Sequence, residues 1–193
     1  VVFDTSLNPH YREVLASYGR NALIDMACVD YAPEPGGNID ALAGAIDDET
    51  AAVIVQYPDF FGRIADVRPL ADACHRAKAL LIMVVHPLAL GVLKTPGEMG
   101  ADIAVGEGQS LGLPLNYGGP FLGFAACTKK LMRRLPGRLV GEARDAEGRR
   151  GFVLTLQARE QHIRRERATS NICSNQVLCA LQALAYMTVM GKQ

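Results

Sequence analysis

The stretch that decides the fold is AAVIVQYPDFFGRIADVRPLADACHRAKALLIMVV, residues 51–85. It opens on Ala51–Val55, a run that is apolar at every position, as expected of a central parallel strand covered on both faces. Helical spacing follows over Asp66–Ala77, and Leu80–Val85 is a second apolar run. Two apolar strands joined by a helix form a βαβ unit, so this stretch predicts an α/β protein with a mainly parallel sheet.

The same alternation continues on both sides of this unit. Further strands are expected at 1–3, 22–29, 101–105 and 121–127, and further helices at 9–18, 39–46, 155–168 and 174–190. With helices on both faces of the sheet, we expect one large α/β domain over residues 1–193. Val1 stands in an apolar run without an initiator methionine, and the chain stops two residues after Gly191. We therefore expect a fragment truncated at both ends of a longer protein.

The composition excludes several classes of partner. Twenty basic and twenty acidic residues give a formal net charge of zero, which favours neither nucleic acid nor an anionic membrane. The longest apolar run, Ala79–Val85, is far shorter than the ~20 residues that cross a bilayer, and no charged-then-apolar leader opens the chain. The five cysteines lack metal-site spacing, and their odd number argues against a disulfide scaffold. We expect a cytoplasmic protein with no metal, nucleic-acid or membrane partner.

A glycine-rich stretch at 106–112 is the first candidate for chemistry. It matches neither the dinucleotide-binding pattern nor the phosphate-binding loop. Its Gly-Gln-Ser-Leu-Gly portion has the spacing of a hydrolase nucleophile elbow, in which Ser110 would attack with His162 as base and Asp145 as the orienting acid. Such an elbow must open a helix, and the glycines and prolines that follow oppose one. Serine hydrolysis is therefore a weak hypothesis for this stretch.

The supply of lysines limits cofactor chemistry. A lysine that holds an aldehyde cofactor as an imine projects from a strand end into a pocket that lowers its pKa. Lys129 and Lys130 follow a strand, but an adjacent pair is typical of a solvated surface, and Lys94 precedes a Thr-Pro-Gly loop signal. The only other lysines are Lys78 and Lys192. We expect none of the five to act as a nucleophile.

The densest polar segment is QAREQHIRRERATSNICSN, residues 157–175. On a helix, Glu160 would reach Arg164 by the i,i+4 rule, which predicts a salt-bridged, solvated face. Alternatively, the arginines beside Ser170 and Asn171 line an anion-binding cleft or a subunit interface, because guanidinium groups suit carboxylates and phosphates. The residues themselves leave both interpretations open.

Four stretches carry a resemblance to a known family. They are PDFFGRIAD at 58–66, PGEMGADIAVGEGQSLG at 96–112, GGPFLG at 118–123 and the segment 136–175, in which REQHIRRE is followed by TSNIC. Together they resemble the N-terminal half, or subunit 1, of the decarboxylating glycine dehydrogenase, the P-protein of the glycine cleavage system. The likeness extends over nearly the full chain.

The resemblance implies the large domain of a fold-type-I enzyme of pyridoxal phosphate (PLP). In that family PLP condenses with glycine, stabilises the carbanion left by loss of CO₂, and passes an aminomethyl group to the lipoyl-carrying H-protein. The PLP lysine belongs to the C-terminal half, or subunit 2, and the position that resembles it here is Gln109, which cannot form an imine. Where the family usually has Val-Asp-Pro, this chain has Val85-His86-Pro87, and in active PLP domains an acid near that strand end pairs with the pyridine nitrogen. The simpler interpretation of His86 is a capping or packing residue. The tyrosine-rich N-terminal segment that the family uses near substrate is not seen.

These implications lead to a specific prediction. We expect a catalytically silent half of glycine decarboxylase that binds no PLP itself and assembles with the PLP-holding subunit 2, or C-terminal half, and with lipoyl-H-protein. Its degenerate cofactor position is Gln109, with Ser110 and His86 as neighbours. The candidates for the interface or channel between the halves are Arg159, His162, Arg164, Arg165, Ser170 and Asn171. Two alternatives stay open: a stand-alone PLP-dependent enzyme that uses one of the lysines, and a non-enzymatic interaction module.

Overall fold

The computed structural model describes residues 1–33, 38–168 and 176–191, with the backbone alone at Arg159 and Arg167. The chain divides into two compact units. The first comprises Val1–Ala126 together with the segment from Gln176 onward, and the second is Cys127–Asn175.

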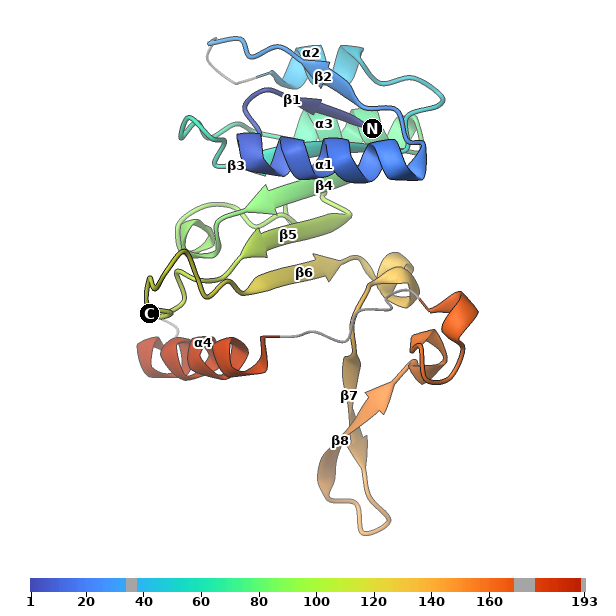
Figure 1. Ribbon diagram of the computed structural model, residues 1–193, viewed down its shortest axis with the longest axis vertical. Helices are drawn as coiled ribbons and strands as arrows, with labels where there is room; N and C mark the ends of the chain where they lie inside the picture. The colour runs from blue at the N-terminus through green and yellow to red at the C-terminus, as the bar shows by residue number, and fades with distance from the viewer. Residues whose placement is uncertain (34–37, 169–175, 192–193) are drawn as a thin grey trace. The chain divides into compact units, whose positions relative to one another are not determined.

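The first unit is built on a six-stranded sheet in the order β2-β1-β3-β4-β5-β6 (Figure 1). The strands are β1 (Val2–Asp4), β2 (Ala27–Val29), β3 (Ala52–Tyr57), β4 (Leu80–Val85), β5 (Ile103–Glu107) and β6 (Gly123–Cys127). The pairs β1–β2, β1–β3, β3–β4 and β4–β5 are all parallel, whereas β6 runs opposite to β5 in Figure 1. The prediction of a mainly parallel sheet is therefore confirmed.

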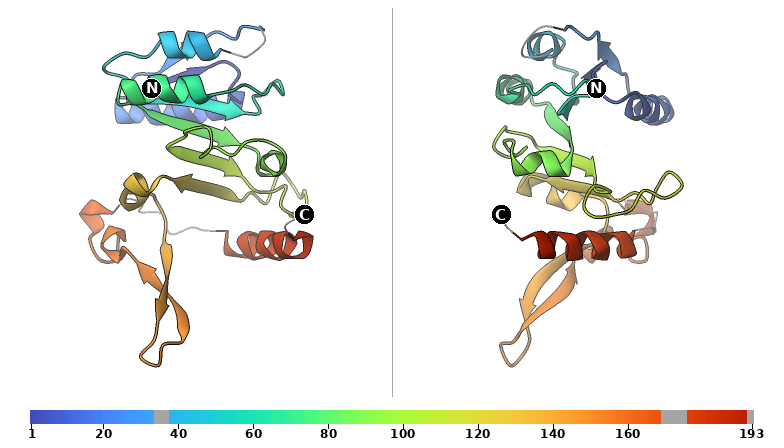
Figure 2. Two further views of the ribbon diagram at one scale, coloured as in Figure 1. Left: turned by 180° about the vertical axis from the view of Figure 1, so that it is seen from behind. Right: turned by 90° about the vertical axis from the view of Figure 1, so that its left-hand side faces the viewer.

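Helices cover both faces of this sheet. The α-helices are α1 (Pro9–Ala22), α2 (Ile39–Gly44), α3 (Arg68–Arg76) and α4 (Val177–Met190), and a 3₁₀ turn η1 (Pro87–Gly91) follows β4. The right-hand view of Figure 2 shows α1 on one face and α2 with α3 on the other. Alternate strand residues point to opposite faces, so Ile54 of β3 packs with Leu7 near α1, whereas Val53 joins Leu70 and Cys74 in the larger core under α3.

The start of α1 follows the sequence signals, but its end does not. Asn8 accepts a hydrogen bond from the His10 N–H at 2.9 Å, and Pro9 occupies the first turn, where no donor is needed. The helix predicted to end at residue 18 continues to Ala22. Gly19 is instead a buried helical position packed against Met26, whose terminal methyl group a Cβ at this position would displace.

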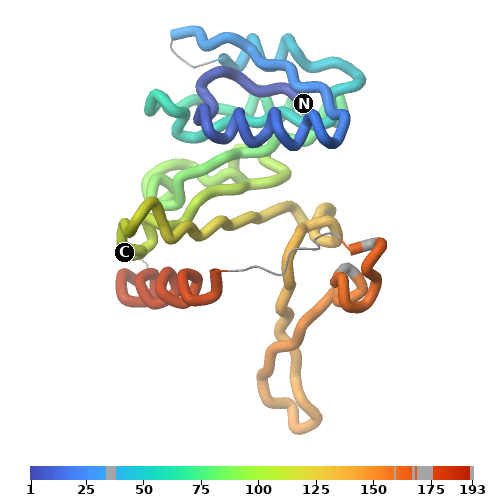
Figure 3. Tube along the Cα trace, in the orientation of Figure 1, coloured from blue at the N-terminus to red at the C-terminus, as the bar shows by residue number. Residues whose placement is uncertain are grey.

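The second unit holds the largest departure from prediction. β7 (Leu139–Arg144) and β8 (Arg150–Thr155) pair antiparallel as a hairpin, visible in Figure 3 as two adjacent chain segments. None of the strands predicted from the sequence lies in this region. The helix predicted over 155–168 is also wrong, because the described residues of that range form only the end of β8 and two short 3₁₀ turns, η3 (Gln157–Arg159) and η4 (Arg165–Arg167). A third 3₁₀ turn, η2 (Lys129–Arg134), follows β6.

Local turn chemistry explains the hairpin. Asp145 accepts hydrogen bonds from the N–H groups of Glu147 and Arg149 at 3.0 and 2.8 Å, and Gly148 takes a φ of 77°. A side-chain acceptor and a glycine with positive φ are the requirements of a tight turn. These two residues reverse the chain, and the strands on either side then pair.

Candidate functional site

Polar residues gather at the C-terminal edge of two neighbouring strands. In open α/β sheets, ligands bind beyond the carboxyl ends of the parallel strands. His86 directly follows β4, Glu107 ends β5, and Gln109 and Ser110 lie in the turn after β5. Because β4 and β5 are adjacent and parallel, these residues belong to one edge of the sheet. This edge is the candidate site.

Glu107 fixes the turn after β5. Its Oε1 accepts hydrogen bonds from the Gln109 N–H at 2.8 Å and the Leu122 N–H at 2.7 Å. The Gly108 N–H also donates to the Leu122 carbonyl at 2.7 Å. Bonds from backbone amides to an ionised carboxylate are among the stronger hydrogen bonds in proteins. Glu107 therefore ties the end of β5 to the segment that enters β6.

A helix from the far end of the chain supports the same turn. Gln182 of α4 donates from Nε2 to the Gly112 carbonyl at 2.9 Å. Gly112 has a φ of 82°, and a Cβ there would clash with the ring of Tyr186. The turn that carries Gln109 and Ser110 is therefore held at both ends by contacts that no local spacing rule predicts.

Gln109 and Ser110 carry unused hydrogen-bonding capacity. Among the described residues, the only buried side-chain nitrogen or oxygen atoms without a hydrogen-bond partner are Gln109 Nε2 and Ser110 Oγ. Buried polar groups in native proteins are nearly always hydrogen-bonded. Two adjacent residues that each bury a polar atom without a hydrogen-bond partner therefore need an explanation. The same observation weakens serine hydrolysis, because the Ser110 hydroxyl has no base beside it and the residues after it form a turn instead of the required helix.

His86 is exposed at the start of η1. Its backbone carbonyl accepts the Ala89 N–H at 3.1 Å, but its side chain makes no capping hydrogen bond. The imidazole therefore stands at the sheet edge without the capping role that the sequence left open.

The residues at this edge do not fit PLP. An imine requires a lysine, but position 109 carries an amide, and the Glu107 carboxylate is bound by two backbone amides. The four lysines within the described residues are all exposed: Lys78, Lys94, Lys129 and Lys130. Lys78 precedes β4 and so belongs to the opposite edge of the sheet. No step of PLP chemistry can be assigned to these side chains.

The remaining predicted site residues belong to the second unit. His162, Arg164 and Arg165 are exposed, and Arg159 contributes its backbone to η3. Ser170 and Asn171 lie outside the described residues. The Arg164 N–H donates to the Glu160 carbonyl at 3.0 Å, but among the described ion pairs the Glu160 carboxylate faces Arg138, with Oε2 lying 3.9 Å from its Nε.

Sequence reasoning missed a cluster inside the 58–66 stretch. Asp59 accepts from the N–H of Arg63 at 2.8 Å and from its Nε at 2.8 Å. The Arg63 guanidinium lies 4.1 Å from the centre of the Tyr31 ring and donates to the Ala32 carbonyl at 2.7 Å. This cluster joins the loops that follow β3 and β2, and the Asp-Phe-Phe-Gly-Arg spacing is its only local signal.

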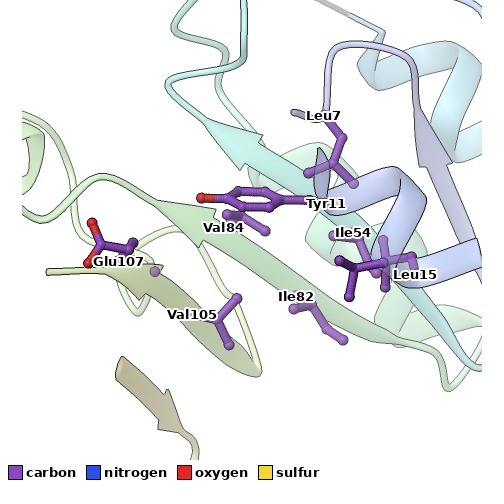
Figure 4. Close-up of a pocket in the computed structure, with 10 residues that line it drawn as sticks. Leu7, Tyr11, Leu15, Ile54, Ile82, Val84, Val105 and Glu107 are labelled. Atoms are coloured by element: carbon purple, nitrogen blue, oxygen red, sulfur yellow. The ribbon is translucent and has the colours of Figure 1, made fainter. Parts of the chain in front are cut away.

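An open apolar groove of about 470 Å³ lies between α1 and the sheet. Figure 4 shows Tyr11 and Leu15 of α1 on one side, Ile82 and Val84 of β4 on the other, and Glu107 at one end. The lining is otherwise apolar, and Glu107 already binds two amides. The groove is therefore suited to packing against an apolar surface and lacks the polar groups of a catalytic pocket.

The buried thiol of Cys74 and the acidic groups of the described residues offer no second reactive centre. Burial, reinforced by the charge of Asp102, raises the pKa of the Cys74 thiol to about 11, so this thiol stays protonated and unreactive near neutral pH. No group of three His, Cys, Asp or Glu within the described ranges is arranged to hold a metal ion. In the same ranges, no helix combines the length and apolarity needed to cross a membrane.

Comparison with known protein families shows which family this chain belongs to. The family model described as glycine cleavage system P-protein matches residues 1–193. The chain belongs to the glycine cleavage system P-protein family. A protein of Sphingopyxis alaskensis named probable glycine dehydrogenase (decarboxylating) subunit 1 is 58% identical over 99% of this chain and 42% of its own length. The protein of the same name from Desulforamulus reducens is 54% identical over 100% of this chain and 43% of its own length. The chain thus spans less than half the length of these relatives, and the predicted family is confirmed.

Solved structures give the same result for the fold. The crystal structure of an inhibitor-bound glycine decarboxylase (P-protein) of the glycine cleavage system matches with a TM-score of 0.88 and 47% identity, over 99% of this chain and 43% of that one. The metB structure from Corynebacterium glutamicum matches with a TM-score of 0.54 at 16% identity, over 68% of this chain and 32% of that one. The second likeness concerns the fold alone. The predicted fold class, that of fold-type-I PLP enzymes, is confirmed.

Proposed function

We propose that this P-protein chain is part of the half of glycine decarboxylase that holds no PLP, and that it acts by completing an assembly with the half that does. The observation that carries the proposal is Gln109. It stands just beyond β5, where the family resemblance sets the PLP lysine of the other half, and an amide nitrogen cannot form an imine. The exposure of every described lysine supports the same conclusion.

In this proposal the chain's own residues position and bind, while the chemistry occurs in the partner half. PLP bound there supplies an electron sink for the carbanion that remains when glycine loses CO₂. Glu107 keeps the Gln109 turn in place through two backbone amides. The Gln109 Nε2 and Ser110 Oγ atoms are buried without a hydrogen-bond partner, so they would bond to groups of the partner half only through a rearrangement of this turn on assembly.

The interface role predicted from sequence is retained as part of the proposal. The exposed Arg164 and Arg165 present guanidinium groups, which suit carboxylates on a facing subunit. We extend this role to the other candidates of the same segment, which are Arg159, His162, Ser170 and Asn171. The remaining partner is the lipoyl-carrying H-protein, which accepts the aminomethyl group.

Intact-mass measurement after borohydride reduction tests the proposal. The chain is incubated with PLP, reduced and weighed, and the experiment is repeated with subunit 2 alone and with both together. We expect a stoichiometric phosphopyridoxyl adduct on subunit 2 and none on this chain, and glycine-dependent CO₂ release only when both are present with lipoyl-H-protein. A single stoichiometric adduct on Lys94, Lys129 or Lys130 would overturn the proposal, because the chain would then be a PLP enzyme in its own right.

Single-lysine variants make the negative result specific. Nonspecific reduction at surface lysines gives partial labelling spread over several sites. Variants Lys94→Arg, Lys129→Arg and Lys130→Arg should each lower such labelling slightly, whereas a stoichiometric adduct at a true cofactor lysine would be abolished by the variant of that lysine and by no other.

A further inference from the structure

One face of strands β4 and β5 is only partly covered. Strands in parallel sheets are normally covered by helices on both faces. The register pairs Ile54 with Ile82 and Val84 with Val105, and the alternation of side chains along a strand puts all four on the face that α1 covers. Ile54, next to α1, is buried, whereas the other three are only half-buried. This strip of sheet therefore has room for a further apolar group.

The strip is the floor of the open groove between α1 and the sheet (Figure 4). The groove has a volume of about 470 Å³, within the range of roughly 300–1,000 Å³ that is typical of small-molecule sites. Ten residues line it, fewer than the roughly 20–30 residues that a protein interface uses on each side. A small molecule therefore suits the groove better than a folded partner does.

The apolar floor of the groove ends in a carboxylate. Val105 and Glu107 are alternate residues of β5, so their side chains point to the same face of the sheet. Because Val84 pairs with Val105, Glu107 lies four residues along the strands from the level of Ile82. At about 3.3 Å per residue, the apolar floor in front of the carboxylate is roughly 13 Å long.

One oxygen of this carboxylate is open. Both backbone amides that bind Glu107 donate to Oε1, so Glu107 holds its turn without using Oε2. Within the described residues, Oε2 accepts no hydrogen bond and forms no ion pair. Figure 4 shows the Tyr11 hydroxyl pointing toward the carboxylate from the other side of the groove. None of the ten lining residues is basic, so the charge of Glu107 is complementary to a cation from outside the chain.

We propose that this groove binds a small molecule that carries a primary ammonium group on an apolar chain. The ammonium has three N–H donors, and it donates to Glu107 Oε2 and to the Tyr11 hydroxyl oxygen. The apolar chain lies along β4 over Val84, against Leu15 of α1. A carboxylate ligand is repelled by Glu107, and a neutral alcohol of the same length lacks the charge-assisted bond. The inference does not rest on the proposed function, which concerns PLP and a partner half.

NMR titration of the chain with n-octylammonium chloride tests the inference. The amides of Gln109 and Leu122 donate to Glu107, so their signals report on the head group. We expect both signals to shift along one saturating curve. Affinity should rise about threefold to fourfold for each methylene from n-butylammonium to n-octylammonium, as expected for a chain that leaves water. n-Octanol should bind about tenfold more weakly than n-octylammonium, and n-octanoate should not bind.

Matched variants separate the head group from the chain. Glu107→Gln keeps an acceptor for the two amides but removes the charge, so n-octylammonium should bind about tenfold more weakly and n-octanol should be unaffected. Glu13→Gln makes the same change on an exposed residue of α1 outside the groove and should alter neither affinity by more than about twofold. Val14→Ser, within the groove, should weaken both ligands about threefold, whereas Val92→Ser, on an exposed valine outside it, should weaken neither. Far-UV circular dichroism of each variant should match the unchanged chain.

Three outcomes would overturn the inference. The first is equal affinity for n-octylammonium and n-octanol, which would show that the groove takes any apolar chain. The second is n-octylammonium binding that Glu107→Gln leaves unchanged, and the third is the absence of any shift at the Gln109 and Leu122 amides. The borohydride experiment uses neither these ligands nor these variants, so failure of the ammonium site and failure of the proposed function are distinguishable.

Discussion

Replacement of Gly106 by alanine tests the packing at the end of β5. A Cβ at this position would lie under 3.0 Å from both the Val85 carbonyl oxygen and Cζ of Phe124, closer than real Cβ atoms come. The phenyl ring can rotate away. The carbonyl cannot, because Val85 belongs to β4 and pairs with Gly106 in the parallel ladder. The substitution must therefore push β4 and β5 apart next to Glu107.

The expected loss follows from this backbone clash. Overpacking a well-packed site usually costs about 1–3 kcal/mol, and a clash with fixed backbone puts Gly106→Ala at the upper end, about 2–3 kcal/mol. For a chain of this size each kcal/mol lowers the melting temperature by roughly 2–4 °C, so the midpoint should fall by roughly 4–12 °C. Gly123→Ala is the matched control: it lies in β6 of the same sheet, and its Cβ would meet nothing within 4 Å. Its stability should stay within about 0.5 kcal/mol of the unchanged chain.

Urea unfolding followed by far-UV circular dichroism, with a thermal melt of each variant, measures the difference. The packing explanation is refuted if Gly106→Ala and Gly123→Ala unfold at the same urea concentration. It is also refuted if both lose stability equally, since the loss would then reflect alanine in any strand of this sheet.

Three further predictions concern Glu107, Cys74 and the pair Arg164 and Arg165. Glu107→Gln should lower the free energy of unfolding by about 1 kcal/mol in urea titration, because two backbone amides lose an ionised acceptor. The pKa of Cys74 is raised to about 11 by burial and by Asp102, so its stabilising contribution is complete below the ordinary thiol pKa and is lost as pH rises through about 11; a urea midpoint that stays constant across that range would contradict this. Arg164→Ala combined with Arg165→Ala should reduce CO₂ release by the reconstituted assembly while leaving the circular dichroism of the chain unchanged, and full turnover would exclude an interface role.

The central part of the fold is predictable because its signals are local. The predicted strand 80–85 is observed as β4 with the same bounds, and the predicted strand 51–55 and helix 66–77 appear as β3 and α3, with ends shifted by two residues or fewer. Strands covered on both faces by helices are apolar at every position, so no neighbour in space needs to be known to recognise them. The short edge strand β2 was predicted five residues too long, because an edge strand has less apolar surface to bury.

The second unit was mispredicted because its helical pattern has no core to pack against. A helix over 155–168 was expected from i,i+4 spacing, but surface pairs of this kind contribute only about 0.2–0.5 kcal/mol each. Thr155 instead pairs with Leu139 as the last residue of β8, and the Glu160 carboxylate lies near Arg138, which is far from it in sequence. Charge spacing without an apolar stripe is therefore weak support for a helix.

The candidate site was recognised from motif resemblance, and its supporting contacts could not be. The position of Gln109 was identified by likeness of the surrounding sequence, whereas the Glu107 bond to Leu122 spans fifteen residues and the Gln182 bond to Gly112 spans seventy. The Asp59 and Arg63 cluster likewise depends on Tyr31, which is far away in sequence. Such contacts arise from strand order, and strand order is not encoded in any short spacing.

At the end of β5, packing and hydrogen bonding within the chain account for Gly106 and Glu107 but not for Gln109 and Ser110. Gly106 is required by the close approach of β4, and Glu107 is satisfied by two backbone amides, so neither residue needs a ligand. Gln109 Nε2 and Ser110 Oγ are buried without a partner, and each such group costs about 1–3 kcal/mol relative to a hydrogen-bonded one. A chain that functioned alone would gain by replacing them with apolar side chains. A half whose turn rearranges against another protein at this edge would recover the cost on assembly, and on that condition the two atoms favour a chain completed by its partner over an enzyme that works alone.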